Sequence, residues 1–560
     1  MRKRLIFDCV LMGVVGALAA QVFMWLLHTC ASLFLNTLAG YQAPGIPSEG
    51  GALTQVIGPH WLWLIPVVTT LGGLISGVLV YSLGPDAAGD GTDAAVAAFH
   101  RGGGLIRARV APLRTVASAI TIGSGGSAGR EGPISSIAAG VSSVYATITG
   151  RGEKERRLLV LVGMASGLSA IFRSPIGTAI FAIEVLYSEM EFDAAALLLT
   201  MLGSVTAYAV NGLFTGWMPL FLVPEGLGVT SIEDYLWYGL LGLIAGPVAT
   251  LIPEVFYRLR DLFQAIPIPP HFKPALGGLG VGLLALAVPQ VLAGGYGWIQ
   301  YAIDGKLAVG LLGVLVLAKL LAFSLTVSSG GSGGVFAPTL FIGAMLGGLL
   351  AHVLHTPPAA FAVVGMAAVF GGAARIPIAT LLMVTEMTGG YNLLVPAALA
   401  VVLSHMVQVN LSRGLKYKSL YEAQVPSPWF SPAHRVDQVR ATLRIMQDGR
   451  FSLSEAVGHL DLLPLLDSGV PMDLPDGKQL ITGVLREDSD CIGQPIGEGC
   501  LGRQGSGMET VAVFRKGETL LPHSGETYQA GDEILIVADA TAREAVARHL
   551  DTKPGGGGKT

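Results

Sequence analysis

Two short glycine-rich segments carry residue types that could hold an anion without a fixed positive side chain. They are SGGSAGREGP at residues 124–133 and SGGSGGVFAP at residues 329–338. In each, a Ser/Gly run leads to a proline and an apolar stretch, which predicts a helix starting at Pro133 and at Pro338. The free N–H groups and the dipole of a helix N-terminus attract negative charge. The pair therefore predicts an anion site built from backbone amides, and turns that only allow close helix packing are the alternative.

Glu131 stands inside the first of these loops, in apolar surroundings where a carboxylate is costly to bury. An ionised carboxylate at a helix N-terminus can occupy the anion site itself, and it can leave that site when protonated. Glu131 is therefore predicted to act as a gate. The alternatives are a structural cap or an ion pair with Arg130, although neighbouring side chains tend to diverge.

The chain around these loops has the composition of a membrane protein. Of its 560 residues, 51% are apolar and 13% charged, and about 10% of residues 1–425 are charged against about 24% of residues 426–560. Residues 320–374 hold no Asp, Glu, Lys or Arg, whereas a transmembrane helix needs only ~20 apolar residues. This pattern excludes one large soluble domain, and nothing in it indicates a nucleic-acid surface. Apolar segments run near residues 5–37, 60–83, 107–149, 157–187, 194–222, 232–262, 274–304, 308–325, 333–356, 359–389 and 392–412.

Several of these segments are broken by glycine or proline, and two of them repeat. Residues 163–185 align without gaps with residues 365–387, with eight identities that include Arg173/Arg375, Pro175/Pro377 and Glu184/Glu386. The two glycine-rich loops align at nearly the same offset. Interrupted helices at membrane depth are tolerated where they face protein or a water-filled cavity. Paired interruptions in two repeats are the pattern of a transport protein with its site between the halves.

Four ordered motifs resemble the CLC family of chloride channels and proton-coupled chloride exchangers. They are GREGP at 129–133, GGVFAP at 333–338, EMTGGY at 386–391 and the pair Leu420-Tyr421. The resemblance covers about residues 1–425. It implies an all-α polytopic membrane protein with an inverted internal repeat and broken helices, and a homodimer in which each subunit has its own pathway for chloride or other small anions.

The same resemblance assigns roles by position. It implies that Glu131 is the gating residue, that the amides of Arg130 and Gly132 form part of an outer anion site, and that Val335, Phe336 and the Tyr421 hydroxyl serve a central one. Without the family match, Tyr421 could equally be an ordinary tyrosine at a helix end.

Two positions depart from the family pattern. The usual GSGIP is replaced by GDGTD at 89–93, which puts Asp90 at the anion-binding serine; a carboxylate there repels chloride unless it is protonated or turned away. Asp90 could instead cap a helix beginning near Ala94. In proton-coupled members a second glutamate usually follows the one matching Glu184, and here that position is Val185.

Because valine cannot relay a proton, the sequence favours a passive chloride channel gated by Glu131. A proton-coupled chloride antiporter is the alternative, with Glu184 or Glu189 in the relay. A sodium-coupled transporter and a cation channel gated by its soluble domain are more remote. No cofactor is expected, and an enzyme is disfavoured because the final GGGGKT has Lys553 where a phosphate-binding loop needs glycine.

The polar C-terminal part predicts a small α+β cytoplasmic domain. Residues 475–550 resemble the ligand-binding C-terminal subdomain of the RCK/TrkA type, with 426–474 as a linker and 551–560 as a flexible tail. A regulatory module for a small-molecule ligand and a ligand-free dimerisation domain are both compatible with it. The two transmembrane repeats are expected at about 60–220 and 232–412.

Positive charge flanks both ends of the membrane part. Arg2, Lys3 and Arg4 precede the first apolar segment, and Arg413, Lys416 and Lys418 follow the last. Since cytoplasmic flanks are enriched in Lys and Arg, we expect an integral protein of the cell's inner membrane with both termini in the cytoplasm and an even number of crossings. The four cysteines show no metal spacing and no disulfide framework.

Overall fold

The computed structural model describes two compact units, divided near residue 427. The described residues of the first unit are 3–58, 61–188, 194–224, 226–229 and 231–427. Described residues of the C-terminal region are 431, 472–473, 478–486, 488–496, 501, 508–515, 518–520, 522, 525–539, 546 and 549–551.

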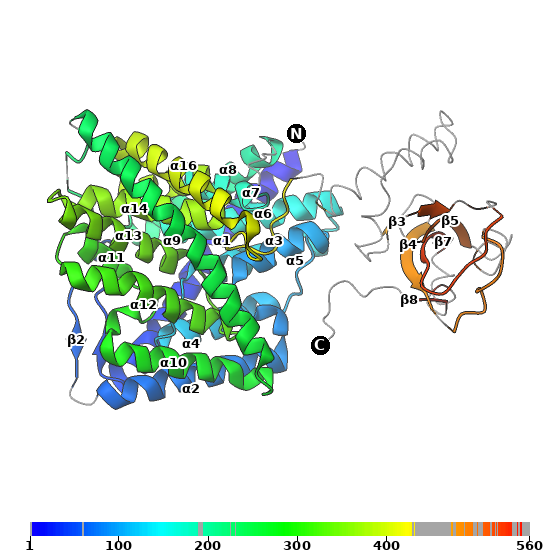
Figure 1. Ribbon diagram of the computed structural model, residues 1–560, viewed down its shortest axis with the longest axis horizontal. Helices are drawn as coiled ribbons and strands as arrows, with labels where there is room; N and C mark the ends of the chain where they lie inside the picture. The colour runs from blue at the N-terminus through cyan, green and yellow to red at the C-terminus, as the bar shows by residue number, and fades with distance from the viewer. Residues whose placement is uncertain are drawn as a thin grey trace. The chain divides into compact units, whose positions relative to one another are not determined.

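Helices make up nearly all of the first unit (Figure 1). Two short strands, β1 (Tyr41–Gln42) and β2 (Val56–Ile57), pair in the loop after the first helix. The α-helices of its described part are α1 (Lys3–Ala31, continued as a π-helix over Ser32–Leu38), α2 (Trp61–Leu83), α3 (Gly91–Arg101), α4 (Val110–Gly123), α5 (Glu131–Ile148), α6 (Glu153–Phe172), α7 (Pro175–Glu184), α8 (Ala194–Thr215), α9 (Ile232–Ala265), α10 (Lys273–Ala287), α11 (Tyr296–Ile303), α12 (Val309–Ser328), α13 (Phe336–Val353), α14 (Pro358–Ala374), α15 (Pro377–Thr388) and α16 (Leu394–Leu411).

The helices fall into two halves that repeat the same packing. In the first half α1 packs on α4, α6 and α8, and in the second α9 packs on α12, α14 and α16. The pairs α2 with α10 and α7 with α15 pack across the two halves, and α2 and α10 lie side by side in Figure 1. By these contacts α1 takes the place in the first half that α9 takes in the second.

Seven helices of the described part are long and apolar enough to cross a membrane. They are α1, α2, α8, α9, α12, α13 and α16. Four shorter apolar helices, α4, α7, α14 and α15, accompany them. The apolar segments 107–149, 157–187 and 359–389 are each broken into two helices, so the breaks expected from glycine and proline are present.

The breaks at 173–175 and 375–377 have the same local cause. Arg173 and Arg375 end α6 and α14 in the left-handed conformation, with φ of 55° and 57°. The residue after each arginine precedes a proline, which disfavours the helical conformation there. Pro175 and Pro377 then occupy the first helical turn of α7 and α15, where a missing N–H costs nothing.

Two glutamates then lock the halves together by capping each other's helix. The carboxylate of Glu184 accepts N–H groups from Ile378 and Ala379 at 3.1 and 2.6 Å. The carboxylate of Glu386 accepts N–H groups of Ile176 and Gly177 at 3.2 and 2.9 Å, and the Ser174 hydroxyl at 2.6 Å. Each short helix thus receives its anionic N-terminal cap from the other repeat.

The second unit contains an antiparallel sheet. Its strands are β3 (Met472–Asp473), β4 (Lys478–Leu485), β5 (Met508–Arg515), β6 (Glu518–Leu520), β7 (Glu533–Asp539) and β8 (Leu550–Asp551). They follow the order β3-β4-β7-β5-β6, with β8 also beside β4. A buried Asp532 accepts two bonds from the Arg515 guanidinium, at 2.8 and 2.9 Å. Cys491 is disulfide-bonded, which the cysteine spacing did not predict, and most of residues 540–548 lie outside the described residues.

The shared caps predict a stability effect. Glu184→Ala removes the carboxylate that accepts two backbone N–H groups, each bond being worth ~1.5–3 kcal/mol, so the free energy of unfolding should fall by about 3–6 kcal/mol. Glu184→Gln, which keeps one acceptor oxygen, should lose less. Chemical unfolding of the detergent-solubilised protein measures both.

Glu233→Gln is the matched control, because Glu233 is an exposed carboxylate in the first turn of α9. An unfolding midpoint for Glu184→Ala equal to that of this control would contradict the capping role.

Candidate functional site

The two glycine-rich loops pair back to back. Gly129 and Gly334 exchange two N–H to O=C hydrogen bonds, both at 2.8 Å, which brings the N-termini of α5 and α13 together. Glycine is required for this approach: a Cβ on Gly334 would lie 2.5 Å from Glu131 Oε1 and 2.6 Å from the Gly132 nitrogen. The helices begin at Glu131 and Phe336, two residues before the predicted prolines, because proline fits the third helical position as well as the first.

The Glu131 carboxylate occupies the site where these N-termini meet. The side chain is 2% exposed, and its Oε1 accepts the Ala337 N–H at 2.9 Å. The backbone N–H groups of Phe336 and of Glu131 itself also face it. A carboxylate oxygen therefore lies against backbone amides at the positive ends of two helix dipoles.

Two residues that the sequence reasoning missed support this carboxylate. The Tyr296 hydroxyl donates to Glu131 Oε2 at 3.4 Å, and its ring stacks on Phe221. Lys319 is completely buried in α12 and donates to the carbonyls of Val291 and Ala293 at 2.9 and 2.7 Å. It thereby fixes the turn before α11, which carries Tyr296. A lone lysine in an apolar helix is a signal that could have pointed to Lys319.

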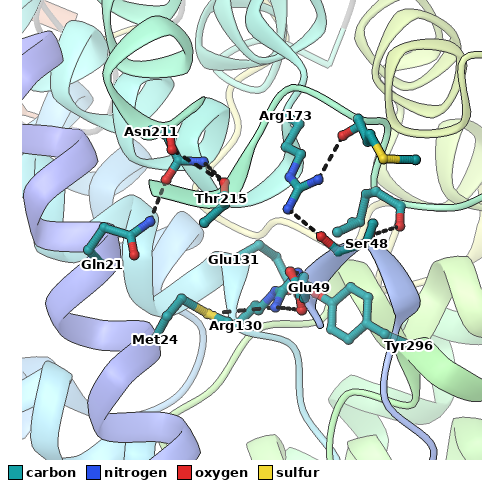
Figure 2. Close-up of polar contacts among 12 residues, drawn as sticks. Gln21, Met24, Ser48, Glu49, Arg130, Glu131, Arg173, Asn211, Thr215 and Tyr296 are labelled. Carbon is teal, nitrogen blue, oxygen red and sulfur yellow. Dashed lines mark hydrogen bonds and ion pairs between the residues drawn. The ribbon is translucent and has the colours of Figure 1, made fainter. Parts of the chain in front are cut away.

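The side chain of Arg130 points away from Glu131, as expected for sequence neighbours. It forms a bidentate ion pair with Glu49 at 2.6 and 3.0 Å, and its guanidinium lies 4.3 Å from the Tyr296 ring centroid (Figure 2). Burial by itself would raise the pKa of Glu49, but the charge and hydrogen bonds of Arg130 outweigh it and hold that pKa below the ordinary value of 4.5. Glu49 therefore stays ionised.

A cavity of about 420 Å³ adjoins this ion pair. Arg173 lines it and donates to the backbone carbonyls of Ser48 and Met218 at 2.9 and 2.7 Å, while Gln21 and Asn211 join by a hydrogen bond on the opposite wall (Figure 2). Its lining combines apolar side chains with polar ones, among them two arginines and one carboxylate. The charged groups of this lining sum to a formal charge of +1, since one carboxylate is present with two arginines.

On another flank of the Glu131 turn lie Asp90 and Tyr421. Asp90 Oδ2 accepts the Asp93 N–H at 2.9 Å and caps α3, which begins at Gly91 rather than near Ala94. Asp90 Oδ1 and the Tyr421 hydroxyl have no hydrogen-bond partner among the described residues. The Tyr421 ring packs edge-on against Phe181, which meets Phe336 in the same way.

The structure therefore gathers most of the residues singled out by sequence. They lie around one point and are Glu131, Gly132, Phe336, Asp90 and Tyr421. Ala337, which the sequence reasoning missed, supplies the amide bond to Glu131 there. The Arg130 side chain faces Glu49 instead, and no bond from the Val335 amide to the Glu131 carboxylate is found. Val185 is buried in apolar packing, Glu184 serves as a cap, and Glu189 lies outside the described residues.

Apolar spans, broken helices in two repeats and amides holding a carboxylate define an integral membrane protein for anion transport. Its sequence matches the family described as voltage gated chloride channel over residues 72–409. The chain belongs to this family, CLC.

Among its relatives, a ClcB-like protein of Ralstonia nicotianae with a provisional chloride channel name is 31% identical over 71% of this chain and 91% of its own. The protein named H(+)/Cl(-) exchange transporter ClcA of Salmonella agona is 31% identical over 62% of this chain and 76% of its own.

Solved structures share the fold. A slow cyanobacterial Cl⁻/H⁺ antiporter superposes with a TM-score of 0.65 at 20% identity, over 75% of this chain and 96% of its own. A CLC-type fluoride/proton antiporter gives 0.61 at 24% identity, over 76% and 97%. The predicted fold class, an all-α membrane domain with an inverted repeat and broken helices, together with a small C-terminal domain that contains a sheet, is confirmed.

The buried pair predicts a coupling free energy. In a double-mutant cycle of Glu49→Gln and Arg130→Gln, each single variant leaves one partner uncompensated, so the two losses of stability should not add and should differ from the double variant by about 1–3 kcal/mol. Chemical unfolding in detergent at pH 7 measures the four proteins.

The depressed pKa sets the pH range. A carboxyl with a lowered folded-state pKa contributes stability above its ordinary pKa and loses it as pH falls through the folded value. The coupling should therefore persist at pH 5 and vanish only below the ordinary carboxyl range. Additive losses at pH 7 would refute the pair.

Proposed function

We propose that this chain is a proton-coupled chloride exchanger in which chloride and the Glu131 carboxylate compete for one amide site. The bond from the Ala337 N–H to Glu131 Oε1 carries the proposal. The amides accept one negative group at a time, so chloride enters only when the carboxylate leaves. Protonation removes the charge that the amides and dipoles hold, and it releases Glu131.

Competition of this kind links the two ions. A proton that frees the site lets chloride bind, and departure of the proton returns the carboxylate to displace chloride. Relatives named as exchangers and solved antiporters of the same fold support coupled exchange over passive conduction. The sequence favoured a passive chloride channel because of Val185. We rank that function second to coupled exchange, and flux measurements distinguish the two.

We infer the surroundings of this activity from the family resemblance and from the flanking charges. The proposed unit is a homodimer in the cell's inner membrane, with both termini cytoplasmic and one pathway per subunit. Amides of Gly132 and Val335 would complete the pathway around Phe336 and Tyr421. The division into a membrane part, a linker near 426–474 and a ligand-sensing module of the RCK/TrkA type at 475–550 is part of the same proposal.

Coupling is tested in liposomes loaded with chloride and diluted into low-chloride medium. Outward chloride flow through an exchanger should drive protons inward against their gradient, which a pH electrode records as external alkalinisation that persists until the chloride gradient is spent. Chloride efflux without proton movement would refute exchange and support a passive chloride channel.

Replacing the gate tests the competition directly. Glu131→Gln has the shape of the protonated side chain and cannot regain the charge, so chloride flux should persist, lose its dependence on pH between 4 and 8, and move no protons. Glu233→Gln serves as control and should behave as wild type. A Glu131→Gln protein with the wild-type pH response would remove Glu131 as the gate.

A further inference from the structure

The two carboxyl oxygens of Asp90 differ in their hydrogen bonding. Oδ2 accepts the Asp93 N–H, which accounts for a helix cap. Oδ1 is buried and without a hydrogen-bond partner among the described residues. A cap needs only one acceptor, and asparagine or serine would serve equally. The second oxygen therefore requires a different explanation.

Oδ1 lies against Gly132, which follows Glu131 in the chain and packs on Gly334. A Cβ on Gly132 would lie 2.5 Å from Asp90 Oδ1 and 2.7 Å from the Gly334 Cα, and a Cβ on Gly334 would lie 2.5 Å from Glu131 Oε1. The two carboxyls thus lie on two flanks of one backbone crossing. Because both residues are glycines, their backbones can approach closely between the two carboxyls.

The hydroxyl of Tyr421 joins these flanks. Tyr421 is 2% exposed, and the Thr92 side chain lies near its hydroxyl, although no hydrogen bond of normal geometry is formed there among the described residues. Asp90 and Glu131 are both among its electrostatic neighbours. A phenolic hydroxyl donates one hydrogen bond and accepts others, so it suits a place between a protonated and an ionised carboxyl.

Further acidic side chains lie between Asp90 and the protein surface. Asp93 is within electrostatic range of both Asp90 and Glu422, and its Oδ1 accepts the Ala423 N–H at 2.8 Å. Asp90 and Asp93 are half-buried, in contrast to Glu131. The Glu422 side chain is 54% exposed and pairs with Arg260.

Charges of both signs face Asp90. Arg114 of α4 holds the turn before it, donating to Gly89 O at 3.0 Å and Asp86 O at 2.9 Å, and it supplies a fully buried positive charge. Glu131 of α5 and Asp93 of its own helix supply negative charge. Charges of both signs therefore act on the Asp90 carboxyl.

We propose that Asp90 is the inner proton-binding carboxyl of the transport cycle, exchanging a proton with Glu131 on one side and with the aqueous side through Asp93 and Glu422. The inference rests on the proposed exchange function. In the transfer, the O–H bond of protonated Glu131 breaks, an O–H bond forms at Asp90 Oδ1, and Glu131 regains its negative charge. The reverse transfer neutralises Glu131 and admits chloride.

Other carboxylates near the two repeats are already engaged. Glu184 and Glu386 cap helices, and Val185 has no titratable group. Among the described residues, Asp90 is the carboxyl that combines a free oxygen with a position beside the Glu131 turn.

The test compares Asp90→Asn with wild type in the chloride-loaded liposomes described above. Asparagine keeps the cap and the volume and cannot bind the proton. We expect loss of proton uptake with chloride efflux retained, so the ratio of the two fluxes collapses. A merely structural role would lower both fluxes together and leave their ratio unchanged, which would overturn the proposal.

Two further variants keep the result decisive if Asp90→Asn yields little protein. Asp90→Glu restores a titratable group and should restore proton uptake, and Asp86→Asn removes an exposed carboxylate of the same loop and should keep the wild-type ratio. If wild type and Asp90→Asn both couple chloride efflux to proton uptake, only the proposed role of Asp90 is overturned. A wild type that moves no protons overturns the exchange function as well.

Discussion

The meeting of two helix N-termini across a pair of glycines is the constraint on which the rest of this structure depends. Gly129 and Gly334 bond directly to each other, so the positive ends of α5 and α13 face one small volume. Such a volume is stable only with negative charge inside it, since the amides have no other partner. In this conformation the charge comes from the chain itself, through Glu131.

Secondary contacts exist to keep that volume in shape. Lys319 fixes the turn that carries Tyr296, and Glu49 neutralises Arg130 so that its charge does not compete for Glu131. Arg114 likewise fixes the loop before Asp90 by donating to a backbone carbonyl. These residues come from distant parts of the chain. Lys319 and Arg114 donate to buried backbone carbonyls, and Glu49 pairs with a buried guanidinium, groups that would otherwise lack a partner.

Sequence patterns predicted what is local and repeated, and missed what is brought together by folding. The glycine loops, the breaks before Pro175 and Pro377 and the separation of Arg130 from Glu131 follow from local stereochemistry. Ala337 was missed because the helix begins two residues earlier than the proline rule suggested. Tyr296 and Glu49 could not have been found, since no spacing connects residues over 80 positions away to Glu131 or Arg130. For Asp90, capping and a role in the pathway were posed as alternatives, and its two oxygens allow both.

The shared caps have a consequence for how the protein is made. The amides that open α7 are complete only when Glu386 is present, 202 residues after Glu184. At a synthesis rate of ~5–20 residues per second, that wait is about 10–40 s. During this interval the first repeat is in the bilayer while the backbone N–H groups at the start of α7 lack their carboxylate partner. The two halves therefore complete their folding together. Until the second half is synthesised, the free N–H groups of the first half depend on water or another protein for hydrogen bonds.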